Sequence, residues 1–219
     1  MADRFIVIEG LDGSGKATQT ERLRQYFENK GEKVKKLSFP DYDSPSSALV
    51  KLYLDGAFGS DPSDVNAYAA SAFYTVDRAA AYLRYWKKEY LDGWTILADR
   101  YATSNIIYQM SKLPREQWDD FIDFQTDFEY NKIGVPRPGV VIYLDVEPEV
   151  SQRLLSSRYS GDESRKDLHE KNMSFLLSCR ESALYAAKKL GWRIISCTEN
   201  GEMRGIEEIS EDIVKVIGG

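Results

Sequence analysis

A glycine-rich segment near the start of the chain contains the residue types that bind phosphate groups. It reads EGLDGSGKAT from Glu9 to Thr18 and separates an apolar run from a helical pattern. Glycines let backbone N–H groups converge on phosphate oxygens, and the start of a helix adds the positive end of its dipole. Lys16 supplies a mobile positive charge for the outer phosphates. We therefore predict a phosphate-binding loop formed by Gly10, Leu11, Asp12, Gly13, Ser14, Gly15, Lys16, Ala17 and Thr18.

Ala17 departs from the strict form of this motif. Ser or Thr usually follows the lysine directly and binds Mg²⁺ through its hydroxyl. Here the hydroxyl comes one residue later, at Thr18. The metal is then held with help from Thr18 or Ser14, or mainly by phosphates, water and carboxylates.

Two further apolar runs end in polar or aromatic residues. Thr95–Ala98 is followed by Asp99 and Arg100, and another run ends in the sequence FPDY, which includes Tyr42. The carboxyl ends of parallel strands line the ligand crevice of an α/β sheet. There Asp99 can hold Mg²⁺ through water and Arg100 can bind a second phosphate group. Taken alone, the Asp-Arg pair also fits a capping residue and a surface salt bridge.

Aromatic and amide side chains on two expected helices suit a nucleobase. Tyr74 and Arg78 are four residues apart and share a helical face, as do Asn105 and Tyr108 at a spacing of three. An aromatic ring beside fixed donors can stack on a base and bind its edge. The alternative for the first pair is a half-buried core tyrosine and a solvated arginine.

The elements that must position these groups alternate along the chain. Short buried strands are expected at Phe5–Glu9, Val34–Phe39, Thr95–Ala98, Val140–Val146 and Arg193–Cys197. Helices are expected at Ala17–Asn29, Val65–Leu91, Ala102–Met110, Pro114–Asn131, Pro148–Ser157, Leu168–Leu190 and Ile206–Ile217. Such alternation predicts a doubly wound α/β fold in one domain, 1–219. The polar, charged segment 156–167 is by itself typical of a solvated loop.

The composition excludes several classes of protein. With one histidine, His169, and two widely separated cysteines, a His- or Cys-rich metal site and a disulfide framework are not expected. A net charge of −6 without a long basic run argues against nucleic acid as the main partner. No apolar run is long enough to cross a membrane and no signal peptide is visible, so we expect a cytoplasmic protein. The Asn-Lys-x-Asp sequence that GTPases use is absent.

Taken in order, these segments resemble the thymidylate kinase family of nucleoside monophosphate kinases. The resemblance runs from Phe5 to about Leu190 and rests on these motifs: EGLDGSGKATQ, FPDY, the Tyr-x-x-x-Arg helix, DRYATSNIIYQ, PRPGVVIYLDVEPE and the segment leading into DLHE. It implies the three-layer P-loop kinase fold, with a five-stranded parallel sheet, helices on both faces and a mobile lid at about 156–167. It also implies the reaction ATP + dTMP → ADP + dTDP with Mg²⁺.

The resemblance also implies roles for individual residues. The catalytic groups are Asp12, Lys16, Arg100 and a lid arginine, for which the candidates are Arg153, Arg158 and Arg165, because Gly13 stands where other members carry an arginine. The residues implied to bind dTMP are Asp12, Phe39, Pro40, Tyr42, Tyr74, Arg78, Arg100, Ser104, Asn105, Tyr108, His169 and Glu170. The residues implied to organise Mg²⁺ are Asp12, Asp99 and Glu170. His169 replaces a frequent tyrosine and is interpreted as a residue at the base of the lid, not as a catalytic base.

The sequence therefore predicts a dTMP kinase that uses ATP and Mg²⁺ in direct in-line transfer. The alternatives are a kinase for a deoxynucleoside or another pyrimidine monophosphate, and a nucleotide-binding regulator without activity. We expect a homodimer, with the helices that begin at Val65 and Pro114 as its surface. The lid arginine that acts in catalysis and the acceptance of dUMP are left open.

Overall fold

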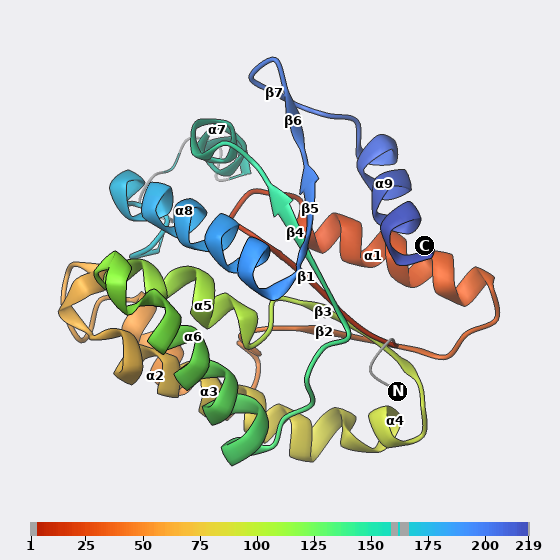
Figure 1. Cartoon of the computed structure of the whole chain (residues 1–219), viewed down its shortest axis with the longest axis horizontal. Helices are drawn as coiled ribbons and strands as arrows, with labels where there is room; N and C mark the ends of the chain where they lie inside the picture. Colours follow the sequence, from red (N-terminus) through yellow and green to blue (C-terminus); the bar gives the residue numbers. More distant parts are fainter. Residues whose placement is uncertain (1–3, 159–161, 163–166, 219) are drawn as a thin grey trace.

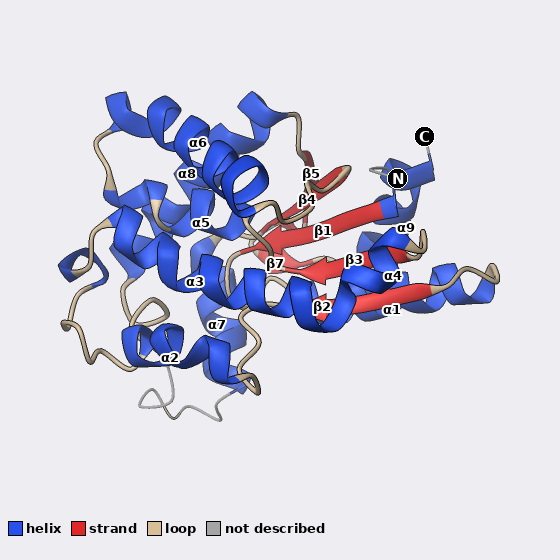
Figure 2. Cartoon of the chain, turned by 90° about the horizontal axis from the view of Figure 1, so that it is seen from below, coloured by secondary structure: helices blue, strands red, loops and turns tan. Residues whose placement is uncertain are grey.

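A parallel sheet of five strands forms the centre of the computed structural model, which describes residues 4–158, 162 and 167–218. Its strand order is β2-β3-β1-β4-β5, and each neighbouring pair is parallel (Figures 1 and 2). The strands are β1 (Phe5–Gly10), β2 (Val34–Ser38), β3 (Thr95–Asp99), β4 (Val140–Asp145) and β5 (Arg193–Ser196). All five expected strands are confirmed to within two residues at each end.

Helices cover both faces of this sheet (Figures 1 and 2). Alternate side chains of β1 enter two separate cores, Phe5 and Val7 on one face and Ile6 and Ile8 on the other. The helices are α1 (Lys16–Asn29), α2 (Ala48–Leu54), α3 (Ala67–Ala81), α4 (Lys87–Leu91), α5 (Thr103–Tyr108), α6 (Trp118–Thr126), α7 (Pro148–Arg158), α8 (Met173–Leu190) and α9 (Ile206–Gly218). Side chains of α1 and α9 fill the core on the Ile6 side, and those of α5, α6 and α8 fill the core on the Phe5 side. The expected three-layer arrangement is confirmed.

Several helices differ from their expected bounds. The stretch expected as one helix at Val65–Leu91 is α3, a π-helical turn at Tyr82–Trp86 and α4. The stretch expected at Pro114–Asn131 is a 3₁₀ turn, α6 and a π-helical segment at Asp127–Ile133. In the third case, α8 starts at Met173 and not at Leu168, because the side chain of Asn172 accepts a hydrogen bond from the Phe175 amide and caps the helix. Helix α2 and the hairpin of β6 (Thr198–Glu199) and β7 (Glu202–Met203) were not expected.

The carboxyl ends of β1, β3 and β2 lie side by side because these strands are neighbours. The segment 11–15 follows β1, Arg100 follows β3, and Phe39 with the cis-linked Pro40 follows β2. The groups predicted to bind phosphate therefore lie along one edge of the sheet. Most of the expected lid, 156–167, falls outside the described residues. Among the described helices, none is long and apolar enough to cross a membrane.

Candidate active site

The glycine-rich loop between β1 and α1 closes around the start of the helix. Gly13 has φ +80°, and a Cβ there would lie 2.7 Å from the carbonyl oxygen of Ser151 on α7, so glycine is required. The Lys16 ammonium is buried and donates to the carbonyl oxygen of Leu11 at 2.7 Å, which folds the side chain back over the loop. Burial, together with the charge of Arg100, lowers the pKa of Lys16 to about 8. The loop thus joins backbone amides to a mobile cation, as phosphate binding requires.

Arg100 connects this loop to the end of β3. Its Nη2 atom lies 2.5 Å from Asp12 Oδ1, and its Nη1 atom donates to the Tyr108 hydroxyl at 3.1 Å. The Tyr108 hydroxyl in turn donates to Asp12 Oδ2 at 3.2 Å. Burial alone would raise the pKa of the Asp12 carboxyl, but the charges of Arg100 and Lys16 hold that pKa well below its usual range. Arg100 has φ +65°, a strained conformation for a residue other than glycine, as is often found at functional sites.

Glu9 fixes the segment that carries Arg100, a role the sequence analysis missed. Its fully buried carboxylate accepts hydrogen bonds from the Tyr101 amide and the Thr103 hydroxyl, at 3.1 and 2.6 Å. It also accepts a hydrogen bond from the Ser104 hydroxyl at 2.7 Å. The hydroxyl of Ser104, which was predicted to bind substrate, is therefore directed at Glu9. A carboxylate inside the apolar run FIVIEG was the signal available, because a buried charge needs partners.

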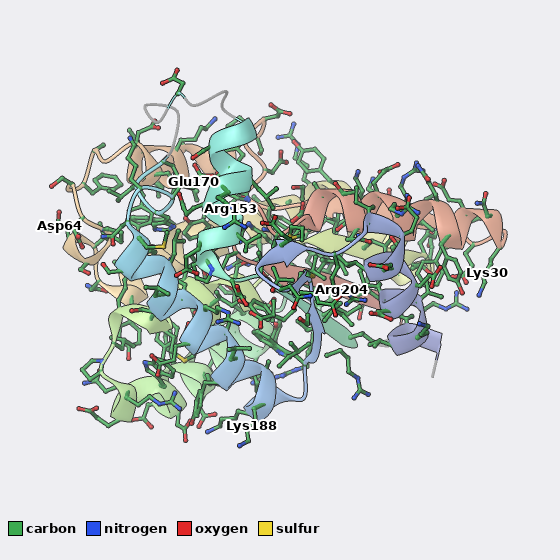
Figure 3. All side chains as sticks on the ribbon, turned by 90° about the horizontal axis from the view of Figure 1, so that it is seen from above. Lys30, Asp64, Arg153, Glu170, Lys188 and Arg204 are labelled. Atoms are coloured by element: carbon green, nitrogen blue, oxygen red, sulfur yellow. The ribbon has the colours of Figure 1, made fainter. Side chains whose placement is uncertain are left out.

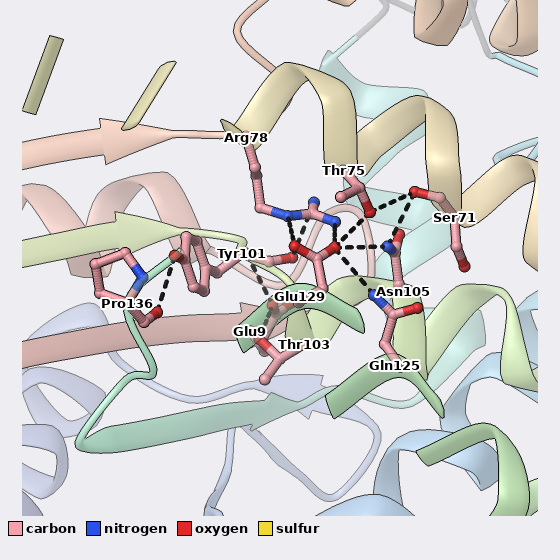
Figure 4. A network of polar contacts seen from close by, with 10 residues as sticks. All are labelled: Glu9, Ser71, Thr75, Arg78, Tyr101, Thr103, Asn105, Gln125, Glu129 and Pro136. Carbon is pink, nitrogen blue, oxygen red and sulfur yellow. Dashed lines mark hydrogen bonds and ion pairs between the residues drawn. The ribbon is translucent and has the colours of Figure 1, made fainter. Parts of the chain in front are cut away.

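Glu129 organises the residues predicted to bind a base (Figure 4). Arg78 and Glu129 form an ion pair in which both side chains are buried. The carboxylate also accepts from Thr75 Oγ1, Gln125 Nε2 and Asn105 Nδ2, at 2.6, 3.0 and 3.4 Å. Arg78 and Asn105 are therefore both held at this carboxylate. Glu129 was missed because the partners are 51 residues apart in sequence.

Asp77 holds the loop that follows β2. The buried carboxylate accepts hydrogen bonds from the Asp41 amide at 2.8 Å and from the Ser46 hydroxyl at 2.6 Å. Tyr42, the next residue after Asp41, lines the cavity described below and is half exposed. Asp77 therefore positions the FPDY segment against α3, one residue before Arg78 on the same helix.

These groups surround one cavity, whose empty volume including its open mouth is about 500 Å³. All the predicted substrate-binding residues except Glu170 line it. The lining is Asp12, Phe39, Pro40, Tyr42, Leu54, Tyr74, Arg78, Arg100, Tyr101, Ser104, Asn105, Tyr108, Gln109, Asp167 and His169. The sequence analysis did not predict Gln109 as a site residue. In the structure its buried Oε1 atom has no hydrogen-bond partner in the described part of the chain.

Of the three predicted lid arginines, the structure describes only the side chain of Arg153, which does not line this cavity. Arg153, on α7, donates to the carbonyl oxygen of Gly201 at 2.6 Å and pairs with Glu202, so it faces the β6–β7 hairpin (Figure 3). The side chain of Arg158 and the whole of Arg165 lie outside the described residues.

The predicted metal carboxylates do not form a ready-made metal site. No group of three or more His, Cys, Asp or Glu within the described ranges can hold an ion. Asp12 is paired with Arg100, and Glu170, which accepts from the Asp167 amide at 3.1 Å, does not line the cavity. The Asp99 side chain, at the end of β3, has no hydrogen bond to any described residue and stays available.

Comparisons with known proteins give one consistent result. The family model described as thymidylate kinase matches residues 8–213. A probable thymidylate kinase of Thermococcus gammatolerans is 29% identical over 97% of this chain and 95% of its own. A thymidylate kinase of Mycobacterium tuberculosis is 30% identical over 83% of this chain and 84% of its own. The structure of a thymidylate kinase from Candida albicans superposes with a TM-score of 0.69 at 22% identity, covering 97% of this chain and 90% of that one.

Proposed function

The chain belongs to the thymidylate kinase family, and we propose that the cavity beside its glycine-rich loop is where dTMP is bound and phosphorylated. The protein is an ATP-dependent nucleoside monophosphate kinase that converts dTMP to dTDP. The observation that carries the site assignment is the Asp12–Arg100–Tyr108 cluster, which joins the loop to the cavity.

The two ends of the cavity differ in chemistry, and this supports one orientation of dTMP. Arg100 and Tyr42 lie toward the loop, where a guanidinium can grip the acceptor phosphate. At the other end Arg78 and Asn105 are fixed by Glu129, with Tyr74 beside them as a ring for stacking. The unpartnered Gln109 Oε1 can accept the N3–H of thymine, while Arg78 can donate to O4.

Phosphoryl transfer needs positioning and positive charge more than acid–base groups. Lys16 and the loop amides would bind the β- and γ-phosphates of ATP, and Arg100 would hold the attacking phosphate in line. The acceptor oxygen is ionised at neutral pH, so no general base is needed. His169 does not supply one, because burial and the charge of Lys112 lower its pKa to about 3.

The carboxylates present fit Mg²⁺ held mostly by substrate. Mg²⁺ keeps several waters and takes few protein ligands when phosphates are available. Asp99 lies near enough to Lys16 and Arg100 for its charge to favour their protonated forms, and its side chain makes no hydrogen bond to a described residue, so it is the carboxylate we propose for the ion. When bound, Mg²⁺ would supply positive charge that neutralises the phosphates of ATP. This arrangement requires no hydroxyl ligand from the protein, so it is compatible with Ala17 in place of the usual Ser or Thr.

An ADP-release assay with ATP–Mg²⁺ and five acceptors tests the proposed site. We expect dTMP to be preferred, with dUMP at least about tenfold poorer for lack of the methyl group. The dCMP amino group would face the donors of Arg78, Tyr108 would crowd the 2′-hydroxyl of UMP, and thymidine would leave Arg100 without a phosphate. Turnover of thymidine but not dTMP would indicate a nucleoside kinase. Binding without turnover of any acceptor would favour a regulator, and Ala17→Ser would then be the first reversion to test.

An apolar face that runs along α3 into the π-helical turn at Tyr82–Trp86 supports a homodimer. Val76 and Leu83 are large apolar residues whose side chains are nevertheless exposed, with 53% and 68% of their surface accessible to solvent. Small or apolar residues recur at helical spacing along this face, namely Ala69, Ala72, Val76, Ala80 and Leu83. The partly buried rings of Phe124 and Phe128 stack on each other on the neighbouring α6 and the segment after it. Such a patch is typical of an interface.

The double variant Val76→Glu/Leu83→Glu is expected to convert the dimer to a monomer, because it places two charges in an apolar interface. Light scattering after gel filtration measures the mass. The control is Leu177→Glu on α8, which is 47% exposed and lies away from α3. A wild-type mass of one chain, or a double variant that stays dimeric, would contradict the assignment of this face.

Both cysteines are free and buried, which is consistent with a reducing compartment and supports a cytoplasmic location.

A further inference from the structure

A chain of polar contacts lies behind the cavity wall at His169. Lys112 Nζ donates to the Tyr53 hydroxyl at 2.7 Å and to the carbonyl oxygen of Val65 at 3.1 Å. The Tyr53 hydroxyl lies 2.9 Å from His169 Nε2. Lys112 belongs to the turn after α5 and Tyr53 to α2, so three distant segments meet here. No role in catalysis has been assigned above to Lys112 or Tyr53.

The hydrogen-bonding roles of Lys112, Tyr53 and His169 determine which atoms carry the protons. An ammonium group only donates, so the Tyr53 oxygen accepts from Lys112 and keeps one O–H to give away. Its possible acceptors are His169 Nε2 at 2.9 Å and the carbonyl oxygen of Pro62 at 3.3 Å. The imidazole nitrogen is nearer and more basic, and donation from the ammonium polarises the O–H further. The hydroxyl therefore donates to Nε2, which leaves the ring proton of the neutral histidine on Nδ1.

The His169 ring is held firmly and lines the cavity. It is 4% exposed and stacks on the Tyr108 ring, with centroids 5.6 Å apart and planes 13° apart. Tyr53 and Phe175 pack against its other sides, with centroids 5.3 and 4.9 Å away. Nδ1 has no hydrogen bond to any described residue. An N–H on this atom therefore remains for a ligand.

We propose that Lys112 and Tyr53 are positioning residues that keep the His169 ring proton on Nδ1, so that the cavity wall offers a hydrogen-bond donor to an oxygen atom of the acceptor nucleotide. The identity of that ligand rests on the proposed function, whereas the position of the proton does not. Burial lowers the pKa of Lys112 to about 8, which leaves it mostly protonated at neutral pH and able to donate to the Tyr53 hydroxyl.

The single histidine of the chain makes the proton directly observable. In ¹⁵N-histidine-labelled protein without a tag, NMR should show a protonated Nδ1 and an unprotonated Nε2 at pH 7. Addition of dTMP should shift the Nδ1 resonance and leave Nε2 nearly unchanged. The opposite tautomer in the free protein would overturn the proposal.

Two variants test the positioning role separately. Tyr53→Phe removes the donor to Nε2, so both ring nitrogens should show tautomer exchange. Lys112→Met removes the donor that polarises the Tyr53 hydroxyl, so the preference of the ring for the Nδ1 tautomer should weaken. Because Tyr53 is buried and its variant can fold poorly, Lys112→Met provides an independent measurement. The matched controls are Tyr26→Phe and Lys30→Met, which break a similar lysine–tyrosine hydrogen bond on the exposed surface of α1.

The kinetic effect of both variants should appear in the affinity for dTMP. We expect KM for dTMP to rise about three- to tenfold, the contribution of one neutral hydrogen bond, with kcat changed less than about twofold. The controls should change neither constant. Unchanged NMR signals in both variants would show that Lys112 and Tyr53 do not fix the ring. If wild-type dTMP turnover itself is absent, the proposed function fails while the NMR result in the free protein still decides the proton position.

Discussion

Arg100→Ala is expected to lower kcat/KM for dTMP about a thousandfold while changing the affinity for thymidine less than about threefold. A guanidinium bound to a phosphate makes two charge-assisted hydrogen bonds, together about 4 kcal/mol. The same change removes the guanidinium that lies 2.5 Å from the Asp12 carboxylate, so we expect the pKa of Asp12 to rise. Steady-state kinetics with dTMP and calorimetry with both ligands measure these effects. Equal losses for dTMP and thymidine would favour a nucleoside kinase.

The backbone at Arg100 supplies a matched control for this variant. Alanine keeps the strained φ of +65°, whereas glycine adopts it freely. Arg100→Gly should therefore be more stable than Arg100→Ala by about 1 kcal/mol and equally slow with dTMP. A glycine variant with restored activity would show that the alanine variant had failed through the backbone. Arg22→Ala, which removes a surface arginine bonded to Ser210 on α9, should leave activity unchanged.

The sequence was informative wherever neighbouring residues carried the signal. The loop from Gly10 to Thr18 was recognisable because glycine, lysine, strand and helix signals are adjacent. The parallel sheet followed from short apolar runs such as β1, whose alternate residues fill both cores. Asp99 and Arg100 could be placed at the ligand edge because they directly follow such a run.

Contacts between distant segments could not be predicted in the same way. Glu129 lies within a stretch with an ordinary amphipathic pattern, and nothing near it in sequence indicates that it pairs with Arg78. The π-helical turns at Tyr82–Trp86 and Asp127–Ile133 also rotate the following residues relative to a regular helix. Arg153 is a second example, because its position near the expected lid suggested a catalytic role, while its contact with the β6–β7 hairpin, which was not expected, could not be predicted from neighbouring residues.

Glu129→Gln should lower the free energy of unfolding by about 3–5 kcal/mol, because it leaves the buried Arg78 guanidinium without a compensating charge. The substitution keeps the shape of the side chain, so loss of packing contributes little. Denaturant titration at constant m-value measures the change. Glu89→Gln is the control. It breaks the partly exposed pair with Lys35 at 3.1 Å and should cost less than about 1 kcal/mol.

A double variant separates the structural role of this pair from its role at the base. Arg78→Met/Glu129→Gln removes both charges, fills similar volume and keeps an amide oxygen that accepts from Thr75, Gln125 and Asn105, so stability should recover. We expect it to unfold at nearly the wild-type denaturant concentration, yet to bind dTMP at least about tenfold more weakly, because the donor to thymine O4 is lost. Wild-type affinity in the stable double variant would show that Arg78 does not touch the base. Loss of less than about 1 kcal/mol in Glu129→Gln alone would mean that the hydrogen bonds from Thr75, Gln125 and Asn105 do not depend on the charge.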